Sequence, residues 1–301
     1  MDEKFYTYAL MKKDLDELKE LFPEIAYKSI GKSIWGREIE CIKIGEGKTK
    51  ILFCGAHHGM EHLTSKLLLT FAKEYLTALK TDGILYNTKA KDLFLHSTLF
   101  IVPMLNPDGV DLSVYGLKAP DINNKDYLLK INPSQDFSHW QANARGVDLN
   151  HNYDALFEKS KESEKLHNIT GPGETRYSGE YPESEPETKA LCDFTRKEDF
   201  NLVMAFHSQG KVIYYDFNQK EPVYSLAIAK AFEDISEYKI DYTEGIASFG
   251  GYKDWFIDKF LRPGYTVEIG EGKNPLPLSD LDKVYKETLP LMASVLSLNL
   301  P

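Results

Sequence analysis

The sequence predicts an α/β protein with a largely parallel sheet that helices cover on both faces. Helical spacing of apolar residues at 63–79 and at 187–194 is followed in each case by an apolar strand-like run, at 98–102 and at 202–206. Such alternation is typical of parallel strands joined by crossover helices. Hydrophobic residues make up 42% and charged residues 27% of the 301 residues, a composition that indicates a globular rather than a disordered chain.

Weaker patterns predict the elements near the two ends of the chain. Residues 14–22 have helical spacing that stops at Pro23. Two β-like runs, 38–44 and 49–55, are separated by a four-residue segment that contains Gly45-Glu46-Gly47, and we interpret them as a hairpin. Residues 276–298 return to helical spacing.

Residues 106–186 lack sustained periodicity and are rich in Pro, Gly, Asn, Asp and Tyr. A loop region this long inside a compact domain is usually functional or disordered. Aromatic residues such as Trp140 and Tyr153 argue against disorder. Because no repeat or composition break marks a second unit, we expect residues 1–301 to form a single domain.

Composition excludes some classes of partner. A net charge of −10 at pH 7 argues against nucleic acid, which requires concentrated Lys and Arg. No apolar run approaches the ~18 residues of a membrane span, and the first four residues do not resemble the start of a signal peptide. Cys41, Cys54 and Cys192 are widely spaced, which favours buried free thiols. We therefore expect a cytoplasmic protein without nucleic-acid or membrane partners.

A group of candidate metal ligands follows the predicted strand at 49–55. His58 and Glu61 are three residues apart, so one turn of chain can aim both at the same point. Taken alone, this pair could equally mark a helix N-terminus, where Glu61 favours the positive end of the helix dipole. His207 directly follows the strand at 202–206, so both histidines should project from the same sheet edge. Two histidines and one glutamate leave the open fourth position of a catalytic zinc ion.

Two further histidines lie beside these ligands. His57 should point elsewhere, because it is adjacent to His58 in the chain. We expect His62 to be a surface residue.

Glu268 places a carboxylate inside an otherwise apolar strand, residues 264–270. A buried carboxylate needs a partner or a function. The partner could be an interior Lys or Arg. Beside a zinc-bound water, Glu268 could instead accept a proton and later pass it to a leaving amine.

Several motifs occur in the order found in the zinc carboxypeptidase family typified by carboxypeptidase A, which this sequence resembles from about Tyr8 to the last predicted helix. They are Ala56-His57-His58-Gly59-Met60-Glu61, Asn106-Pro107-Asp108-Gly109, Gly146-Val147-Asp148-Leu149-Asn150, Ser184-Glu185-Pro186-Glu187, His207-Ser208-Gln209-Gly210, and Gly250-Gly251 through Asp254-Trp255 to Glu268. The resemblance implies one metallopeptidase catalytic domain, residues 1–301, with a three-layer α/β/α fold and a mixed eight-stranded sheet. It also implies one Zn²⁺ per chain and a peptide substrate. Taken alone, Asn106-Pro107-Asp108-Gly109 is a turn, and we expect it to be structural.

The resemblance also implies roles for particular residues. His58, Glu61 and His207 would bind the zinc, and Glu268 would act as general base and acid. Asp148 would orient the first zinc histidine by accepting from its far ring nitrogen; a loop cap is the alternative for this residue.

An arginine steadies the oxyanion in this family, but the usual spacing before Asp148 falls on no arginine. Arg145, three residues before Asp148, is our candidate for this role and for substrate binding. An exposed arginine in a loop is the alternative.

Two positions depart from the family pattern. His151 stands where the family has the arginine that clamps the substrate's C-terminal carboxylate, and Ile246 stands where it has a capping tyrosine. A histidine is mostly neutral near pH 7 and lacks the two-pronged guanidinium fork. Both changes should weaken recognition of an ordinary C-terminus.

Residues 143–152 and 207–210 look like the bacterial γ-D-glutamyl-L-diamino acid endopeptidase branch of the family. That resemblance implies a muropeptide substrate, cut between the side-chain carboxyl of D-glutamate and meso-diaminopimelate. Asn150, His151 and Arg145, with Lys253 as a further candidate, would then bind the substrate. The alternatives are a metallocarboxypeptidase acting on ordinary peptides and a catalytically inactive peptide-binding module.

Overall fold

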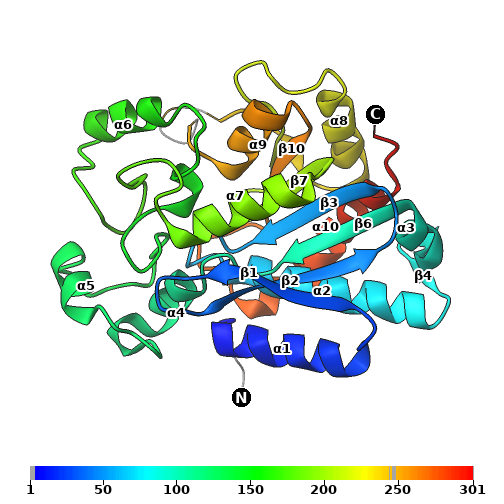
Figure 1. Ribbon diagram of the computed structural model, residues 1–301, viewed down its shortest axis with the longest axis horizontal. Coiled ribbons are helices and arrows are strands. Elements are labelled where there is room, and N and C mark those ends of the chain that lie inside the picture. Colours follow the sequence, from blue (N-terminus) through cyan, green and yellow to red (C-terminus); the bar gives the residue numbers. More distant parts are fainter. Residues whose placement is uncertain (1–3, 244, 246–248, 301) are drawn as a thin grey trace.

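The computed structural model describes residues 4–243, 245 and 249–300. Their helices and strands follow one another along the chain with the bounds below (Figure 1). The helices are α1 (Tyr8–Leu21), α2 (His62–Lys80), α3 (Ala90–His96), α4 (Pro107–Tyr115), α5 (Lys125–Ile131), α6 (Phe157–Leu166), α7 (Pro186–Glu198), α8 (Ser225–Ile235), α9 (Tyr252–Phe260) and α10 (Leu281–Ser294). The strands are β1 (Ala26–Lys32), β2 (Glu38–Gly45), β3 (Thr49–Gly55), β4 (Ile84–Leu85), β5 (Thr88–Lys89), β6 (Ser97–Val102), β7 (Leu202–Ser208), β8 (Val212–Tyr214), β9 (Lys239–Ile240) and β10 (Gly264–Ile269).

A mixed eight-stranded sheet forms the middle of the molecule, in the order β1-β2-β6-β3-β7-β10-β8-β9. Strands β6, β3, β7 and β10 are parallel neighbours, whereas β2 and β8 pair antiparallel with β6 and β10. In register, Gly55 pairs with Phe206 and Glu268 pairs with His207. The carboxyl ends of β3, β7 and β10 therefore meet at one edge, as predicted.

Side chains alternate along β3 and build a separate core on each face of the sheet. Ile51 and Phe53 pack with residues of α1, α2, α8 and α10, whereas Leu52 and Cys54 pack with residues of α7 and α9. Figure 1 shows these two helix layers on opposite sides of the sheet. Each fully buried Leu or Phe side chain stabilises the fold by about 1.5–3 kcal/mol. The three-layer α/β/α prediction is confirmed.

The predicted hairpin between β2 and β3 is wrong, because β6 lies between these strands and pairs with both. Gly45 and Gly47 are needed for a different reason. A Cβ atom at either position would collide with the backbone of His96 or Ser97, where the chain enters β6. Glycine thus permits a close backbone approach here rather than a tight turn.

Helix α1 begins at Tyr8 rather than at residue 14. The side chain of Thr7 caps it by accepting from the backbone N–H of Leu10 at 3.4 Å. Met11, Leu15 and Leu18 are its buried residues, which extend the predicted apolar face toward the N-terminus.

Residues 106–186 are more regular than expected, because they contain α4, α5 and α6. They also form a small core of their own, to which Leu112, Leu128, Phe137 and Trp140 contribute. The predicted turn at Asn106 is the start of α4: its side-chain oxygen accepts from Gly109 N at 2.9 Å. Since Asn106 is a buried cap, its expected structural role is confirmed.

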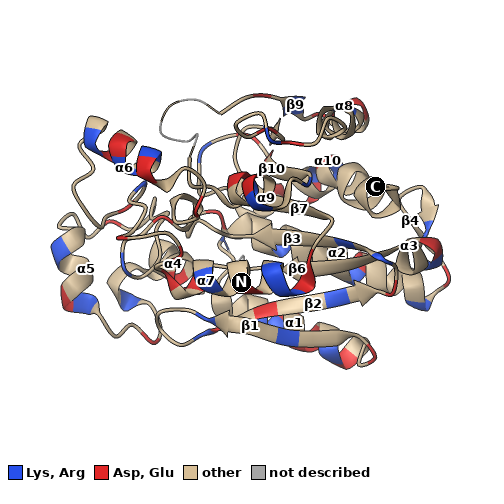
Figure 2. Ribbon diagram, turned by 45° about the horizontal axis from the view of Figure 1, so that its top comes forward, with Lys and Arg blue, Asp and Glu red and all other residues tan. Residues whose placement is uncertain are grey.

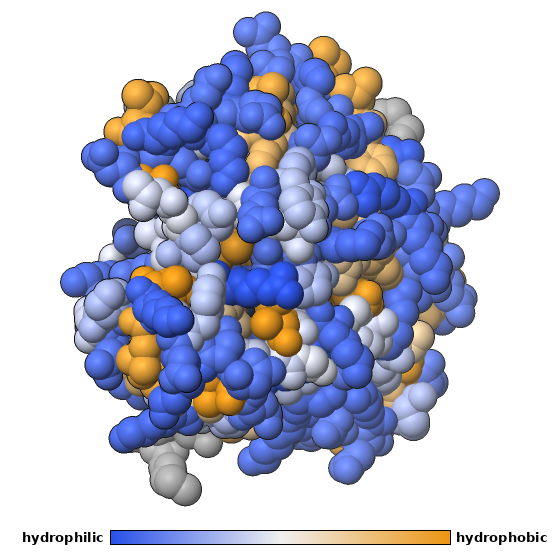
Figure 3. All heavy atoms as spheres, turned by 60° about the vertical axis from the view of Figure 1, so that its left-hand side comes forward, coloured by the Kyte–Doolittle hydropathy of each residue, from blue (hydrophilic) through white to orange (hydrophobic). Residues whose placement is uncertain are grey.

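Charged residues of both signs are mixed over surface helices such as α1, α3 and α6, whereas β7 carries none (Figure 2). On the face seen in Figure 3, hydrophilic residues predominate and apolar ones form small separate patches. Among the described residues, no helix has both the length and the apolar character that crossing a bilayer requires. Cys41, Cys54 and Cys192 are buried free thiols, as expected.

Candidate metal centre and catalytic cavity

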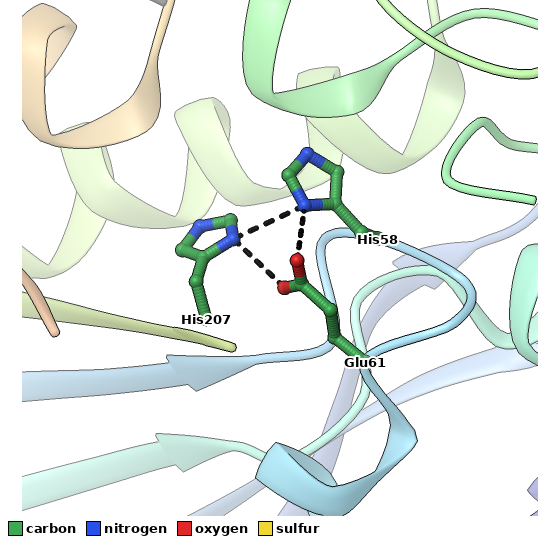
Figure 4. A group of neighbouring side chains, drawn as sticks. All are labelled: His58, Glu61 and His207. Atoms are coloured by element: carbon green, nitrogen blue, oxygen red, sulfur yellow. Dashed lines mark hydrogen bonds and ion pairs between the residues drawn. The ribbon is translucent and has the colours of Figure 1, made fainter. Parts of the chain in front are cut away.

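Three side chains converge at the shared edge of β3 and β7 (Figure 4). His58 Nδ1 lies 2.8 Å from Glu61 Oε1, and His207 Nδ1 lies 2.9 Å from Glu61 Oε2. The two histidine Nδ1 atoms are 3.3 Å apart. Within the described residues, these three form the group of His, Cys, Asp or Glu side chains whose ligand atoms all lie within 4.8 Å of one another.

The surrounding elements explain this convergence. His58 and Glu61 lie in the turn between β3 and α2, and Glu61 occupies the N-cap position of α2. The helix-start interpretation of Glu61 is therefore compatible with the ligand interpretation. His207 is the penultimate residue of β7, the neighbour of β3.

Asp148 supports His58 from behind, as predicted. Its Oδ1 lies 3.1 Å from His58 Nε2 and also accepts from Asn150 N at 3.1 Å. Its Oδ2 accepts from Arg176 N at 2.9 Å. Asp148 also caps the short 3₁₀ turn Leu149–His151, so the loop-cap alternative describes the same side chain. These contacts fix the orientation and tautomer of the His58 ring.

The two other histidines differ in how well they were predicted. The His57 ring stacks on that of His207, and its Nε2 lies 3.1 Å from the Tyr153 hydroxyl rather than in the ligand group. The surface prediction for His62 is wrong, because its side chain is fully buried. His62 Nδ1 accepts from Tyr6 N at 3.3 Å, since the N-terminal segment covers the first turn of α2. Burial lowers the pKa of His62 to about 4.

The electrostatics of the group suit a divalent cation. Burial would raise the pKa of Glu61, but the charges on His58 and His207 outweigh it and lower the pKa to about 2. Burial would lower the pKa of His58, yet Glu61 and Asp148 together raise it well above its ordinary value. Among the described residues, buried His207 Nε2 has no hydrogen-bond partner. Two nitrogen donors and a carboxylate, with one ring held by a second carboxylate, fit a catalytic zinc ion.

Glu268 lies on β10 beside the ligand group, in register with His207. Burial, and then the charge of Glu61, raise the pKa of Glu268 to about 8. A bound cation would offset the Glu61 charge and lower this pKa again. No interior Lys or Arg forms an ion pair with Glu268 among the described residues, so the paired-carboxylate alternative is not observed.

Two cavities flank the ligand group and share four residues: His58, Gln141, Tyr214 and Glu268. One has a volume of about 370 Å³, and we call it the inner cavity. The other has a volume of about 470 Å³, and we call it the outer cavity. A peptide bond placed at the ligand group could therefore extend into both.

Asn150, His151 and Lys253 all line the inner cavity, where they were predicted to bind substrate. Asn150 Oδ1 accepts from Tyr252 N at 3.1 Å, and His151 Nδ1 lies 3.1 Å from the carbonyl oxygen of Phe249. Ile246, the expected position of the capping residue, lies outside the described residues.

Arg145 does not lie where its predicted role requires, and this prediction is corrected. Its side chain is 53% exposed and lies 3.7 Å from Glu185 Oε2. It lines a third cavity rather than the inner or outer one. The backbone N–H groups of Arg145 and Val147 both donate to Asn143 Oδ1 and so form a turn. After this turn Asp148 reaches the ligand group, whereas the Arg145 side chain lines the third cavity.

Two residues of the inner cavity were missed by the sequence analysis. Arg176 supplies a guanidinium. Gln141 lines both cavities, and because its Oε1 accepts from the Thr175 hydroxyl, its amide nitrogen is left as a donor. Their position in a segment without periodicity gave no signal, but Gln141 follows the buried aromatic Trp140, which anchors this part of the chain.

Fold and site together define a zinc peptidase, and the comparison with known proteins agrees. The zinc carboxypeptidase family matches residues 11–291, so the chain belongs to this family. It is 38% identical to γ-D-glutamyl-L-diamino acid endopeptidase 1 of Lysinibacillus sphaericus, over 94% of this chain and 70% of that protein. It is 33% identical to an uncharacterized protein of Bacillus subtilis, YqgT, over 95% of this chain and 76% of that one.

Solved structures support the fold. Bovine thrombin-activatable fibrinolysis inhibitor, in complex with tick carboxypeptidase inhibitor, superimposes with a TM-score of 0.74 at 19% identity, covering 98% of this chain and 97% of that one. Murein-tripeptide amidase MpaA from Escherichia coli O157 gives a TM-score of 0.55 at 20% identity, covering 91% and 92%. The chain is therefore a hydrolase of the zinc carboxypeptidase family with that family's fold.

Proposed function

We propose that this protein hydrolyses the bond between γ-linked D-glutamate and meso-diaminopimelate in peptidoglycan stem peptides, with residues 1–301 acting as one catalytic domain. The observation that carries the proposal is the 38% identity to a γ-D-glutamyl-L-diamino acid endopeptidase over 94% of the chain. The position of the family's clamping arginine supports it, because His151 offers no guanidinium there. The three buried free thiols support a reducing cytoplasm as the setting.

His58, Glu61 and His207 would hold one zinc ion in the proposed reaction. When bound there, zinc lowers the pKa of a water molecule and polarises the scissile carbonyl. Glu268 takes the proton of the attacking water and delivers it to the leaving amine, for which its place beside His58 in both cavities is suitable. Gln141 presents an amide donor from the other wall, where the carbonyl oxygen gains charge.

A metallocarboxypeptidase that releases C-terminal residues from ordinary peptides is the second candidate. It is favoured by Asn150, which the family uses with an arginine to bind the C-terminal carboxylate and which lines the inner cavity here.

A matched pair of substrates tests the proposal. L-Ala-γ-D-Glu-meso-diaminopimelate is compared with the same peptide linked through the α-carboxyl of glutamate. We expect kcat/KM to be higher for the γ-linked peptide by about 10- to 100-fold. This ratio corresponds to the free energy of one charge-assisted hydrogen bond. Mass spectrometry should identify L-Ala-D-Glu and free diaminopimelate as the products. Equal or faster cleavage of the α-linked peptide would favour the carboxypeptidase.

A further inference from the structure

A buried pair of opposite charges lies in the wall of the inner cavity. Lys253 and Asp254 are each only 3% exposed, and both line this cavity. Lys253 Nζ lies 2.5 Å from Asp254 Oδ1, but this ion pair lacks hydrogen-bond geometry, and Oδ1 has no hydrogen-bond partner among the described residues. A buried carboxylate oxygen left in this state is costly. Asp254 lines the cavity, so its carboxylate is a candidate acceptor for a donor that enters.

Arg176 is a second cation in the same cavity. Its backbone is fixed, because its N–H donates to Asp148 Oδ2 at 2.9 Å, while its side chain is exposed and lines the cavity. Within the described part of the chain, the Arg176 guanidinium forms no ion pair. The Lys253 ammonium, in contrast, already contacts Asp254 and the carbonyl oxygen of Asp216. Arg176 is therefore the cation left to bind an incoming anion.

We propose that the inner cavity recognises a zwitterionic amino-acid group, with Asp254 binding its ammonium and Arg176 binding its carboxylate. The proposal rests on the proposed function, because it assigns this cavity to the diamino acid that is released. A guanidinium fork matches a carboxylate in two parallel hydrogen bonds, and a carboxylate oxygen without a hydrogen-bond partner accepts well from an ammonium.

This arrangement selects among diamino acids. The side chain of diaminopimelate ends in both an ammonium and a carboxylate, so it satisfies Asp254 and Arg176 together. Lysine carries only the ammonium and leaves Arg176 without an anion. A 2-aminopimelate side chain carries only the carboxylate and leaves Asp254 Oδ1 without a donor. The cavity should therefore prefer a diamino dicarboxylic acid to lysine.

Three γ-linked tripeptides that differ only in the third residue test the role of Arg176. That residue is meso-diaminopimelate, lysine or 2-aminopimelate. Arg176→Met should lower kcat/KM about 10- to 100-fold on the diaminopimelate and aminopimelate peptides, yet change it less than about twofold on the lysine peptide. Arg145→Met is the matched control, because this exposed arginine lines a different cavity. It should leave all three values unchanged.

Asp254→Asn tests the ammonium side, and it should lower kcat/KM on the diaminopimelate and lysine peptides but not on the aminopimelate peptide. Since Asp254 is buried beside Lys253, zinc content and the melting temperature are measured first. If this variant does not fold, the Arg176 comparison decides alone. An equal effect of Arg176→Met on all three peptides, or no effect on any, would overturn the proposal.

The two proposals fail separately. If wild-type protein prefers α-linked peptides, the proposed function is wrong. The Arg176 comparison is then made on α-linked peptides that end in the same three residues. Loss confined to peptides with a side-chain carboxylate would still support the cavity assignment, whereas uniform loss or no loss would refute it.

Discussion

The metal ligands and the walls of the inner cavity are held in different ways. His58 and Glu61 follow β3, and His207 lies on β7, so the backbone pairing of the central strands sets the ligand positions. Much of the cavity wall, including Asp148 and Arg176, comes instead from residues 106–186, where loops join α4, α5 and α6. The sheet therefore positions the ligand group, whereas loops position this part of the cavity wall.

Specific hydrogen bonds join these two regions. Gly59 N and Met60 N donate at 3.0 Å to the carbonyl oxygens of Gln141 and Trp140. Asn106 Nδ2 donates to the carbonyl oxygen of His57 at 3.0 Å. These bonds hold the cavity wall against the turn that carries His58 and Glu61. A segment of low periodicity can therefore still have a fixed position beside the ligand group.

Two buried carboxylates, Glu185 and Glu187, also hold residues 106–186 in place. Asn143 Nδ2 donates to Glu185 Oε2 at 2.7 Å and to Glu187 Oε2 at 3.2 Å. Glu187 is fully buried and also accepts from Ile34 N at 3.1 Å. Unlike the strand pairing, this anchor contains a titratable group.

The largest expected effect comes from Glu268→Gln, which changes the chemistry at the sheet edge without changing the ligands. The amide has nearly the same shape but cannot accept the proton of the attacking water. We expect kcat to fall about 10²- to 10⁴-fold while zinc remains bound. Steady-state kinetics together with metal analysis checks this result. Turnover near the wild-type rate would place the base elsewhere.

A smaller effect is expected where the two regions meet, at Asp148. Asp148→Asn removes the charge that faces His58 Nε2 and should weaken zinc binding about 10- to 100-fold. Competition with a chelator of known affinity measures this change. Asp136→Asn, an exposed aspartate of the same segment, is the control and should bind zinc like the wild type. An unchanged zinc affinity of Asp148→Asn would show that the sheet positions the zinc ligands without help from Asp148.

The third effect concerns stability rather than activity: the anchor of the cavity wall and its dependence on pH. Burial, and then the charge of Asp108, raise the pKa of Glu187 to about 8. The folded state therefore keeps this proton between about pH 4.5 and pH 8, where the unfolded chain has lost it. Glu187 thus stabilises the fold fully below this window, and the contribution is lost as pH rises through it.

Glu187→Gln cannot titrate and should remove that dependence. Between pH 5 and pH 8, wild-type protein should lose roughly 1–4 kcal/mol of unfolding free energy relative to the variant. Urea unfolding at several pH values measures the difference. Parallel pH curves for the two proteins would mean that Glu187 is ionised throughout.

The same contrast explains what could be predicted from the sequence. Periodicity located β3, β6, β7 and β10, and because parallel strands share an edge, His58, His207 and Glu268 could be brought together before the fold was known. The order of strands was harder to predict. Glycine at position 45 is compatible with both a hairpin and a close approach, and only the partner backbone at Ser97 distinguishes them.

The cavity wall could be predicted only in part. Asn150 and His151 were found because they belong to or adjoin a motif, whereas Arg145 was chosen for its nearness to Asp148 in sequence and lines a different cavity. Arg176 is 28 residues beyond Asp148, and hydrogen bonds such as those from Arg176 N to Asp148 Oδ2 and from Asp148 N to Tyr177 O bring it to the cavity. Such long-range contacts in a segment without periodicity leave no local pattern to detect.

Metal analysis of the purified protein tests most directly the central claim that the sheet edge holds a zinc ion through His58, Glu61 and His207. Wild-type protein should carry one equivalent of zinc per chain. His207→Ala leaves the strand pairing of β7 intact but removes a nitrogen donor, so it should carry almost no zinc while keeping its secondary structure by circular dichroism. A full equivalent of zinc in folded His207→Ala would contradict the account.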